Sequence, residues 1–178
     1  MVLSLSLVRS AISTAALAAL LAMPGASKVS PKHAAIVPTS TRIIVYKRAH
    51  VLRAYRENEL LREFKVALGR GGLAPKVRQG DGRVPEGAYV IEGRNPNSAF
   101  HLSLRIGYPT LEQVKANAAL GVNPGGDIMI HGLPNGRGSV GKRHRLRDWT
   151  EGCIAVTNRE IEWLWRSVPD GTPILILP

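Results

Sequence analysis

The feature that most limits how this chain can fold is a series of short segments rich in β-branched and aromatic residues, each followed by a turn. The first two, 42–46 and 51–55, flank a turn at 48–50 and are typical of a β-hairpin. Four further segments have strand-like composition or alternation, at 63–69, 87–91, 100–104 and 173–177. Many short strands with few helices predict a mainly-β domain, either a sandwich or a partly closed barrel.

Two segments break this pattern and predict surface helices. Residues 110–121 carry apolar side chains at 111, 114, 118 and 119 and end in Gly121, a residue typical of helix C-termini. A second helix is expected to begin at Thr157 or Asn158, since the apolar residues at 161, 164 and 165 then fall on one face. We therefore expect one or two helices on the surface of the β domain.

The N-terminal segment differs in composition from the rest of the chain. Residues 10–23 are an uncharged run of small and apolar residues, followed by Pro24 and Gly25. The run is short for a membrane span, so a cleaved signal peptide over 1–27 is preferred to a retained anchor. Residues 28–41 then form a linker, and 42–178 suffice for one domain with its own core. We expect a periplasmic or secreted protein with no transmembrane span after signal cleavage.

Cys153 is the only cysteine among 178 residues, so an internal disulfide is excluded. A free cysteine is most often a small buried apolar residue. Its neighbours favour a nucleophile instead, because Gly152 lets the backbone turn sharply before it and a helix is expected to begin after it. His131 ends an apolar run and is well placed to emerge from a strand beside the thiol. The sequence therefore predicts a cysteine nucleophile with a histidine partner.

These residue types fit one chemistry. An imidazole beside a thiol withdraws its proton and stabilises the thiolate, which is the reactive form of cysteine. The backbone N–H groups of Gly152 and Cys153, if unpaired at the turn, can receive the negative charge that develops on an attacked carbonyl oxygen. The expected catalytic set is Cys153 as nucleophile, His131 as general base and acid, and Gly152 with Cys153 as oxyanion donors.

Two separated motifs resemble those of a known family. The sequences I-H-G at 130–132 and T-E-G-C-I at 150–154 are similar to the H-G and [ST]-x-G-C-[IV] motifs of the L,D-transpeptidase (YkuD-like) catalytic domain. The segment 80–91 resembles that family's G-D-x-x-T-P-x-G-x-Y-x-I, and the D-W-T-x-G-C-I-A-V-T-N form at 148–158 is typical of one branch. The resemblance covers residues 42–178. It implies the same β-rich fold and a peptidoglycan cross-link formed through a cysteine acyl-enzyme.

The resemblance leaves the fate of that acyl-enzyme open. In this branch, amidases that release protein attached to peptidoglycan occur alongside cross-linking enzymes. We expect a transpeptidase that acts on peptidoglycan stem peptides, forming cross-links or attaching an amine acceptor. The alternative is an amidase or hydrolase in which water is the acceptor at the same residues. A third hypothesis, from a different class, is a non-catalytic domain that binds the cell envelope.

The chain departs from the family pattern two residues after the cysteine, where many members carry an arginine and Ala155 stands here. A basic segment between His131 and Cys153 offers a replacement. Its functional interpretation is a lid that holds carboxylates of the stem peptide, and the alternative is a solvated run of charge. Residues of this segment and neighbours of the catalytic pair are the predicted substrate contacts: Gly132, Thr150, Arg137, Arg143, Arg145 and Arg147, with Lys142 in the same segment.

Other titratable residues have weaker claims to a role. Glu151 either orients an imidazole or is solvated at a loop tip. His50 lies in the predicted hairpin turn and is expected to be solvated, whereas His101 lies in a predicted strand. No H-x-x-x-H, C-x-x-C or clustered carboxylate spacing indicates a metal. No glycine pattern indicates a phosphate-binding loop or a nucleotide cofactor.

The net charge of +11 favours an anionic partner. Nucleic acid is the usual partner of a basic chain, but the basic residues are scattered and no nucleic-acid-binding motif is present. An anionic cell envelope, rich in carboxylates and phosphates, is the better counterpart of an exported protein.

Overall fold

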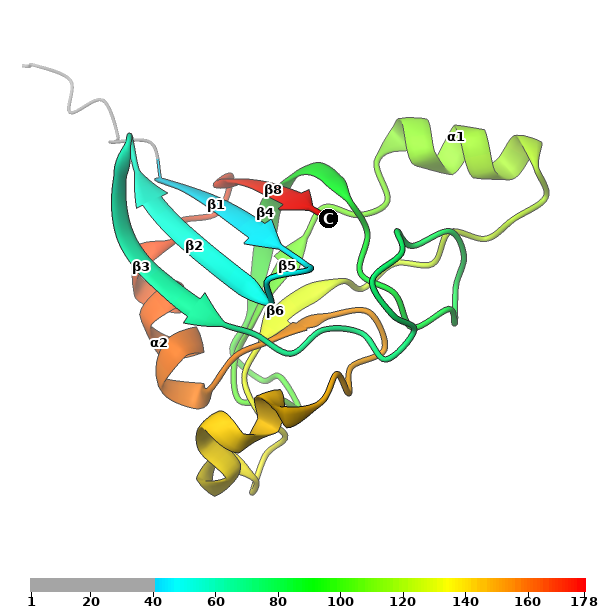
Figure 1. Cartoon of the computed structure of the whole chain (residues 1–178). Helices are drawn as coiled ribbons and strands as arrows, with labels where there is room; N and C mark the ends of the chain where they lie inside the picture. The colour runs from blue at the N-terminus through cyan, green and yellow to red at the C-terminus, as the bar shows by residue number, and fades with distance from the viewer. Residues whose placement is uncertain (1–40) are drawn as a thin grey trace, which may run out of the picture. The chain divides into compact units, whose positions relative to one another are not determined.

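The computed structural model describes residues 41–178, which form a mainly-β domain (Figure 1). Two α-helices, α1 (Leu111–Ala119) and α2 (Asn158–Ser167), and a 3₁₀ segment, η1 (Gly138–Leu146), accompany the strands. The strands are β1 (Thr41–Tyr46), β2 (Val51–Arg56), β3 (Glu59–Lys65), β4 (Gly87–Asn95), β5 (Ser103–Ile106), β6 (Met129–His131), β7 (Ile154–Ala155) and β8 (Pro173–Leu177). The predicted mainly-β fold with one or two surface helices is confirmed. The predicted signal peptide, and all of the predicted linker except its last residue, lie outside the described residues.

The strands form one sheet that curls until its two edges meet. Their order is β3-β2-β1-β8-β4-β5-β6-β7, with β1–β8 and β6–β7 parallel and the other neighbours antiparallel. β3 and β7 are therefore the edge strands. The chain leaving β3 pairs with β7, because Ala67 and Ala155 exchange backbone hydrogen bonds of 3.0 and 2.8 Å. The sheet is thus a partly closed barrel, one of the two architectures that the sequence predicts.

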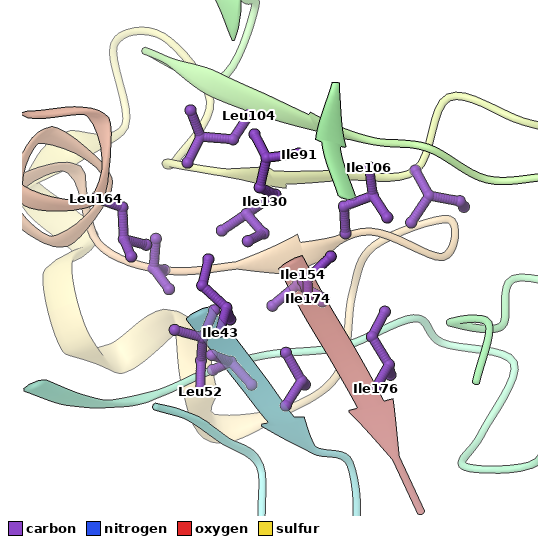
Figure 2. Close-up of a cluster of buried hydrophobic side chains, with 14 of the residues drawn as sticks. Ile43, Leu52, Ile91, Leu104, Ile106, Ile130, Ile154, Leu164, Ile174 and Ile176 are labelled. Atoms are coloured by element: carbon purple, nitrogen blue, oxygen red, sulfur yellow. The ribbon is translucent and has the colours of Figure 1, made fainter. Parts of the chain in front are cut away.

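Aliphatic side chains, many of them isoleucine, fill the inside of the curled sheet. β-branched side chains pack well on a pleated surface, which explains why these segments form strands. Burial of one such side chain stabilises the fold by roughly 1.5–3 kcal/mol. The following residues are each at most 1% exposed and belong to one cluster (Figure 2): Ile43, Leu52, Ile91, Leu104, Ile130, Ile154, Leu164 and Ile174. β6 and β7 are therefore held by the same core as the longer strands.

The two α-helices differ in how they attach to the sheet. Each begins with a capping box, formed by Thr110 with Gln113 in α1 and by Thr157 with Glu160 in α2. α1 buries none of its residues and stands apart from the sheet (Figure 1), whereas α2 buries two apolar side chains against the core. Both predicted helices are confirmed. Neither they nor η1, the helical segments within 41–178, combine the length and apolar character needed to cross a bilayer.

The structure corrects three local predictions. The strand expected at 63–69 starts earlier, at Glu59, and ends at Lys65, because beyond it the chain makes only single bridges to the far edge. The strand expected at 100–104 begins at Ser103, because His101 adopts a left-handed φ of 71° in a turn. The basic segment, for which the sequence indicated no regular structure, is largely the 3₁₀ segment η1, which is kinked at Gly141.

Candidate active site

The β6–β7 pair places His131 and Cys153 on the same face of the sheet. The two strands are parallel, with Ile130 beside Ile154 and His131 beside Ala155. Because side chains alternate along a strand, the two isoleucines enter the core while His131 and Ala155 face the other side, and the same alternation carried one residue before β7 puts Cys153 on the side of His131. Cys153 comes two residues before Ala155, just before β7 begins, so its backbone lies diagonal to that of His131. One strand pair thus brings together two residues that the sequence keeps apart.

The His131 imidazole is held in one orientation. It is 3% exposed, and its Nδ1 lies 2.7 Å from the Gly132 carbonyl oxygen, so Nδ1 carries the hydrogen and Nε2 the lone pair. Phe100 and Trp149 pack against the ring, with centroid separations of 4.5 and 5.6 Å. Burial lowers the pKa of His131 below its ordinary value, and the Gly132 carbonyl opposes this only in part. The imidazole is therefore neutral near pH 7 and able to accept a proton at Nε2.

The Cys153 thiol is half-buried, and its Sγ lies 3.5 Å from the carbonyl oxygen of Asp127. Burial raises the pKa of this thiol above its ordinary value and the Asp127 carboxylate adds to the rise, while the Met129 N–H and the Lys76 ammonium oppose it. A raised thiol pKa and a lowered imidazole pKa make the uncharged pair the resting state. This differs from the sequence-based expectation of a resting thiolate, and the physical reason is that both groups lose water.

The turn before Cys153 requires glycine for two reasons. Gly152 has a φ of 118°, a conformation that other residues rarely adopt, and a Cβ there would lie 2.6 Å from the carbonyl oxygen of Arg83. Thr150 braces the turn, because its hydroxyl donates to the Cys153 carbonyl at 2.7 Å and accepts a longer hydrogen bond, 3.3 Å, from the Gly152 N–H. The predicted sharp turn with close backbone approach is confirmed.

A loop fastened by a buried ion pair packs under this turn. The side chains of Lys76 and Asp81 are 3% and 6% exposed, and Nζ lies 2.8 Å from Oδ1. The Asp81 carboxylate also accepts three backbone N–H groups, from 77, 78 and 83. Burial alone would raise the pKa of Asp81, but the ammonium and the N–H donors outweigh it and hold the pKa well below its ordinary value. The G-D-G-R segment therefore fixes the backbone on which Gly152 rests, a role that sequence reasoning missed.

Three of the predicted substrate contacts have partners within the protein. Thr150 is buried in the turn, where its hydroxyl donates to the Cys153 carbonyl. Gly132 is also buried, and its carbonyl oxygen accepts a hydrogen bond from Nδ1 of His131. Arg145 binds the carboxylate of Glu160 in α2. These contacts give the three residues structural roles. The remaining arginines of the basic segment, Arg137, Arg143 and Arg147, are exposed and line one pocket beside η1.

The aromatic surroundings of His131 were not predicted. Trp149 lies inside the D-W-T motif, and its indole Nε1 approaches Nδ1 of His144 at 3.4 Å. Asp148 of the same motif accepts the Leu68 N–H at 2.7 Å and lies 3.0 Å from Nε2 of His50, so the expectation that His50 is merely solvated is wrong. The Asp148-Trp149 pair in the sequence could have indicated these contacts, since a carboxylate and an indole N–H close to a buried turn need hydrogen-bond partners.

The remaining predicted polar residues lie at the surface. Glu151 is exposed and pairs with Arg70 at 2.7 Å, so it does not orient the imidazole. His101 pairs with Glu162 of α2 at 2.8 Å. Residues 41–178 contain no group of three or more His, Cys, Asp or Glu side chains placed to share a metal ion.

Sequence comparison identifies a family and relatives that this chain resembles. The profile of the L,D-transpeptidase catalytic domain (YkuD) matches residues 40–176. The Escherichia coli K12 protein named "Putative L,D-transpeptidase YafK" is 30% identical over 133 residues, which are 71% of this chain and 46% of that protein. The chain thus spans about half the length of the curated relatives it matches.

Solved structures share the fold. Bd1075 of Bdellovibrio bacteriovorus has a TM-score of 0.55 at 27% identity, over 78% of this chain and 48% of that one. The helical cell shape determining protein Pgp2 of Campylobacter jejuni has a TM-score of 0.59 at 23% identity, over 77% and 47%. An L,D-transpeptidase of Xylanimonas cellulosilytica has a TM-score of 0.51 at 17% identity, over 78% and 60%. The last two similarities concern the fold alone.

Proposed function

Because the chain belongs to the L,D-transpeptidase catalytic-domain family, we propose that it is an exported enzyme that acts on peptidoglycan stem peptides through a cysteine acyl-enzyme. The observation that carries this proposal is the placement of Cys153 and His131 as diagonal neighbours on one face of the β6–β7 pair. The signal peptide predicted over 1–27 and the net charge of +11 fit secretion into an anionic envelope, periplasmic or extracellular.

The first half-reaction starts from the uncharged pair. The Cys153 Sγ attacks the carbonyl carbon of the scissile bond while His131 Nε2 takes the thiol proton, so no free thiolate forms in a desolvated site. The Gly132 carbonyl, which accepts from Nδ1, stabilises the imidazolium that results. The tetrahedral intermediate then expels the amine, which takes its proton from the imidazolium. A thioester on Cys153 and a free amine remain.

The turn supplies the oxyanion donors. Within residues 41–178, no backbone acceptor is found for the Cys153 N–H. The Gly152 N–H makes only the long contact with the Thr150 hydroxyl. Both N–H groups can therefore donate to a developing oxyanion. A charge-assisted hydrogen bond of this kind is stronger than the long contact of Gly152, and it would give the Cys153 N–H an acceptor. The positive φ of Gly152 supports this role, because it makes the backbone turn sharply between these two N–H groups.

The second half-reaction resolves the thioester. Attack by the amine of a second stem peptide forms a new amide bond and breaks the bond to Cys153, while His131 takes the amine proton and returns it to the departing sulfur. Attack by water follows the same steps and gives hydrolysis. Both routes use the same residues, and family membership favours transfer to an amine as the primary activity.

Product analysis of treated peptidoglycan tests the proposal. Sacculi are incubated with the purified 42–178 domain or its Cys153→Ser variant, digested to muropeptides and separated by chromatography with mass detection. We expect new cross-linked species with the wild type and none with the serine variant. Shortened or released stem peptides without cross-links would identify the amidase or hydrolase alternative. Products unchanged from untreated sacculi would support a non-catalytic envelope-binding domain and overturn the proposal.

A further inference from the structure

A pocket of about 350 Å³ lies beside η1 and the chain that follows His131. This volume is in the range of small-molecule sites. Its wall is partly apolar and partly cationic, and none of its lining residues is acidic. The lining residues are Leu133, Pro134, Arg137, Val140, Arg143, His144, Leu146, Arg147 and Trp149.

Three of the lining residues are arginines whose charge is not neutralised. Arg137, Arg143 and Arg147 are exposed, and none has an ion-pair partner within residues 41–178. The sequence has no acidic residue between Asp127 and Asp148, so no carboxylate of this segment competes for them. Most acidic residues elsewhere in 41–178 already bind other groups of the protein, as Glu160 does with Arg145.

Arg145 explains how the three charges are held in place. Its ion pair with Glu160 joins η1 to the first turn of α2, where Glu160 also closes the capping box. The pair is less than one fifth exposed on both sides, so it is partly protected from solvent screening. One arginine of the segment thus anchors it, and the other three are left for a ligand.

The pocket also contains a buried polar group with no partner. His144 is 7% exposed, and its Nδ1 accepts the Trp149 indole N–H, which leaves the hydrogen on Nε2. This Nε2 has no hydrogen-bond partner among the described residues. Burial, followed by the charge of Arg145, lowers the pKa of His144 to about 4, so the ring is a neutral donor near pH 7. Trp149 both lines this pocket and packs against the His131 imidazole, with ring centroids 5.6 Å apart.

We propose that this pocket binds a part of the stem peptide that carries at least two carboxylates. By holding these carboxylates, the pocket positions the stem peptide beside His131. The inference rests on the proposed function, which supplies the peptide. Guanidinium groups bind carboxylates in paired geometry, and the apolar wall formed by Leu133, Val140 and Trp149 accepts the aliphatic part of such a peptide. A free anion without an apolar body would leave that wall uncovered.

Binding without turnover tests this inference separately from catalysis. The Cys153→Ala protein is titrated by calorimetry with a soluble stem tetrapeptide and with the same peptide whose carboxylates are amidated. The test variant adds Arg137→Gln, Arg143→Gln and Arg147→Gln. The matched control adds Arg48→Gln, Arg56→Gln and Arg166→Gln, three exposed arginines outside the pocket, so that net charge falls equally.

We expect the pocket variant to bind the free-acid peptide at least about ten-fold more weakly, since each lost charged hydrogen bond is worth about that factor. The control should change affinity by less than about two-fold, because screened distant charges act weakly. The amidated peptide should bind wild type weakly and lose nothing further in the pocket variant. Equal affinity of the pocket variant and wild type for the free-acid peptide, or an equal loss for both peptides, would overturn the inference.

Acylation of Cys153 by a carbapenem distinguishes failure of the pocket proposal from failure of the proposed function. It is measured in protein that retains the cysteine, with and without the three pocket substitutions. Normal acylation together with unchanged peptide affinity would refute the pocket and leave the proposed function standing. Absent acylation in the wild type would refute the proposed function, while the titration still decides whether the pocket binds carboxylates.

Discussion

Replacement of Asp81 by Asn is expected to destabilise the domain far more than a typical surface substitution. The change removes the charge that neutralises the buried Lys76 ammonium and places an amide group among the three N–H donors. Removal of one partner of a buried ion pair costs about 3–5 kcal/mol of unfolding free energy. For a domain of this size, that loss lowers the melting temperature by roughly 10–15 °C.

Asp170→Asn is the matched control. Asp170 also pairs with an arginine, Arg94, at 2.8 Å, but its side chain is 54% exposed, so the loss should stay below about 1 kcal/mol. Urea denaturation followed by tryptophan fluorescence measures both variants. Unfolding free energies of Asp81→Asn and Asp170→Asn within 1 kcal/mol of each other would show that the Lys76–Asp81 pair does not fasten the loop.

The same variant should change how stability depends on pH. The folded pKa of Asp81 is lower than its unfolded value, so its contribution is fully present above the unfolded pKa and is lost as pH falls through the folded one. Wild type should therefore lose stability steadily below about pH 4, the ordinary range of an aspartate. Asp81→Asn should show a shallower decline. If unfolding free energy falls with pH equally steeply in both proteins, other carboxylates are responsible for the loss of stability in acid.

Further predictions concern the catalytic turn and its base. His131→Ala should slow alkylation of Cys153 by iodoacetamide near pH 7, and an unchanged rate–pH profile would move the base role elsewhere. The acid limb of the activity–pH profile should lie below pH 6.5, because burial lowers the pKa of His131 and the neutral ring is the active form; a midpoint above 7 would contradict this. Gly152→Ala should lower the unfolding free energy by roughly 1–3 kcal/mol because of its positive φ, and by more because the new Cβ would meet the Arg83 carbonyl. Gly93→Ala is the control, since a Cβ there meets nothing, and it should lower the unfolding free energy by less than about 1 kcal/mol. Lys76→Met should raise the thiol pKa in the same alkylation assay, and Lys76→Arg should restore it.

The strands that sequence reasoning found are those with a local signal. Segments such as β1 and β8 carry runs of β-branched residues whose burial decides their conformation, so their composition predicts them. β6 and β7 contain only three and two residues, too few to show a period, and their parallel pairing depends on contacts between distant parts of the chain. The pairing of Cys153 with His131 was predicted because Gly152 precedes the cysteine and His131 ends an apolar run, although the strand register could not be read from the sequence.

Features that depend on tertiary burial were missed for a physical reason. Lys47 directly follows β1 and has no motif around it, yet it is fully buried. Its Nζ donates to the Ala74 and Val84 carbonyls at 3.2 and 3.0 Å and to the Glu86 carboxylate at 2.8 Å. Such a site exists only once three separate segments have assembled around one ammonium. The uncharged resting state of the Cys–His pair belongs to the same class, since burial of both groups is a property of the fold.

Trapping of the acyl-enzyme tests the central claim most directly. Wild type, Cys153→Ser and His131→Ala are incubated with a carbapenem, and the intact mass and the modified peptide are determined by mass spectrometry over time. We expect a single adduct on the peptide that contains Cys153 in the wild type, slow formation of that adduct in His131→Ala and no adduct in Cys153→Ser. An adduct that persists in Cys153→Ser, or a wild-type protein that forms none, would contradict the assignment of Cys153 as the nucleophile.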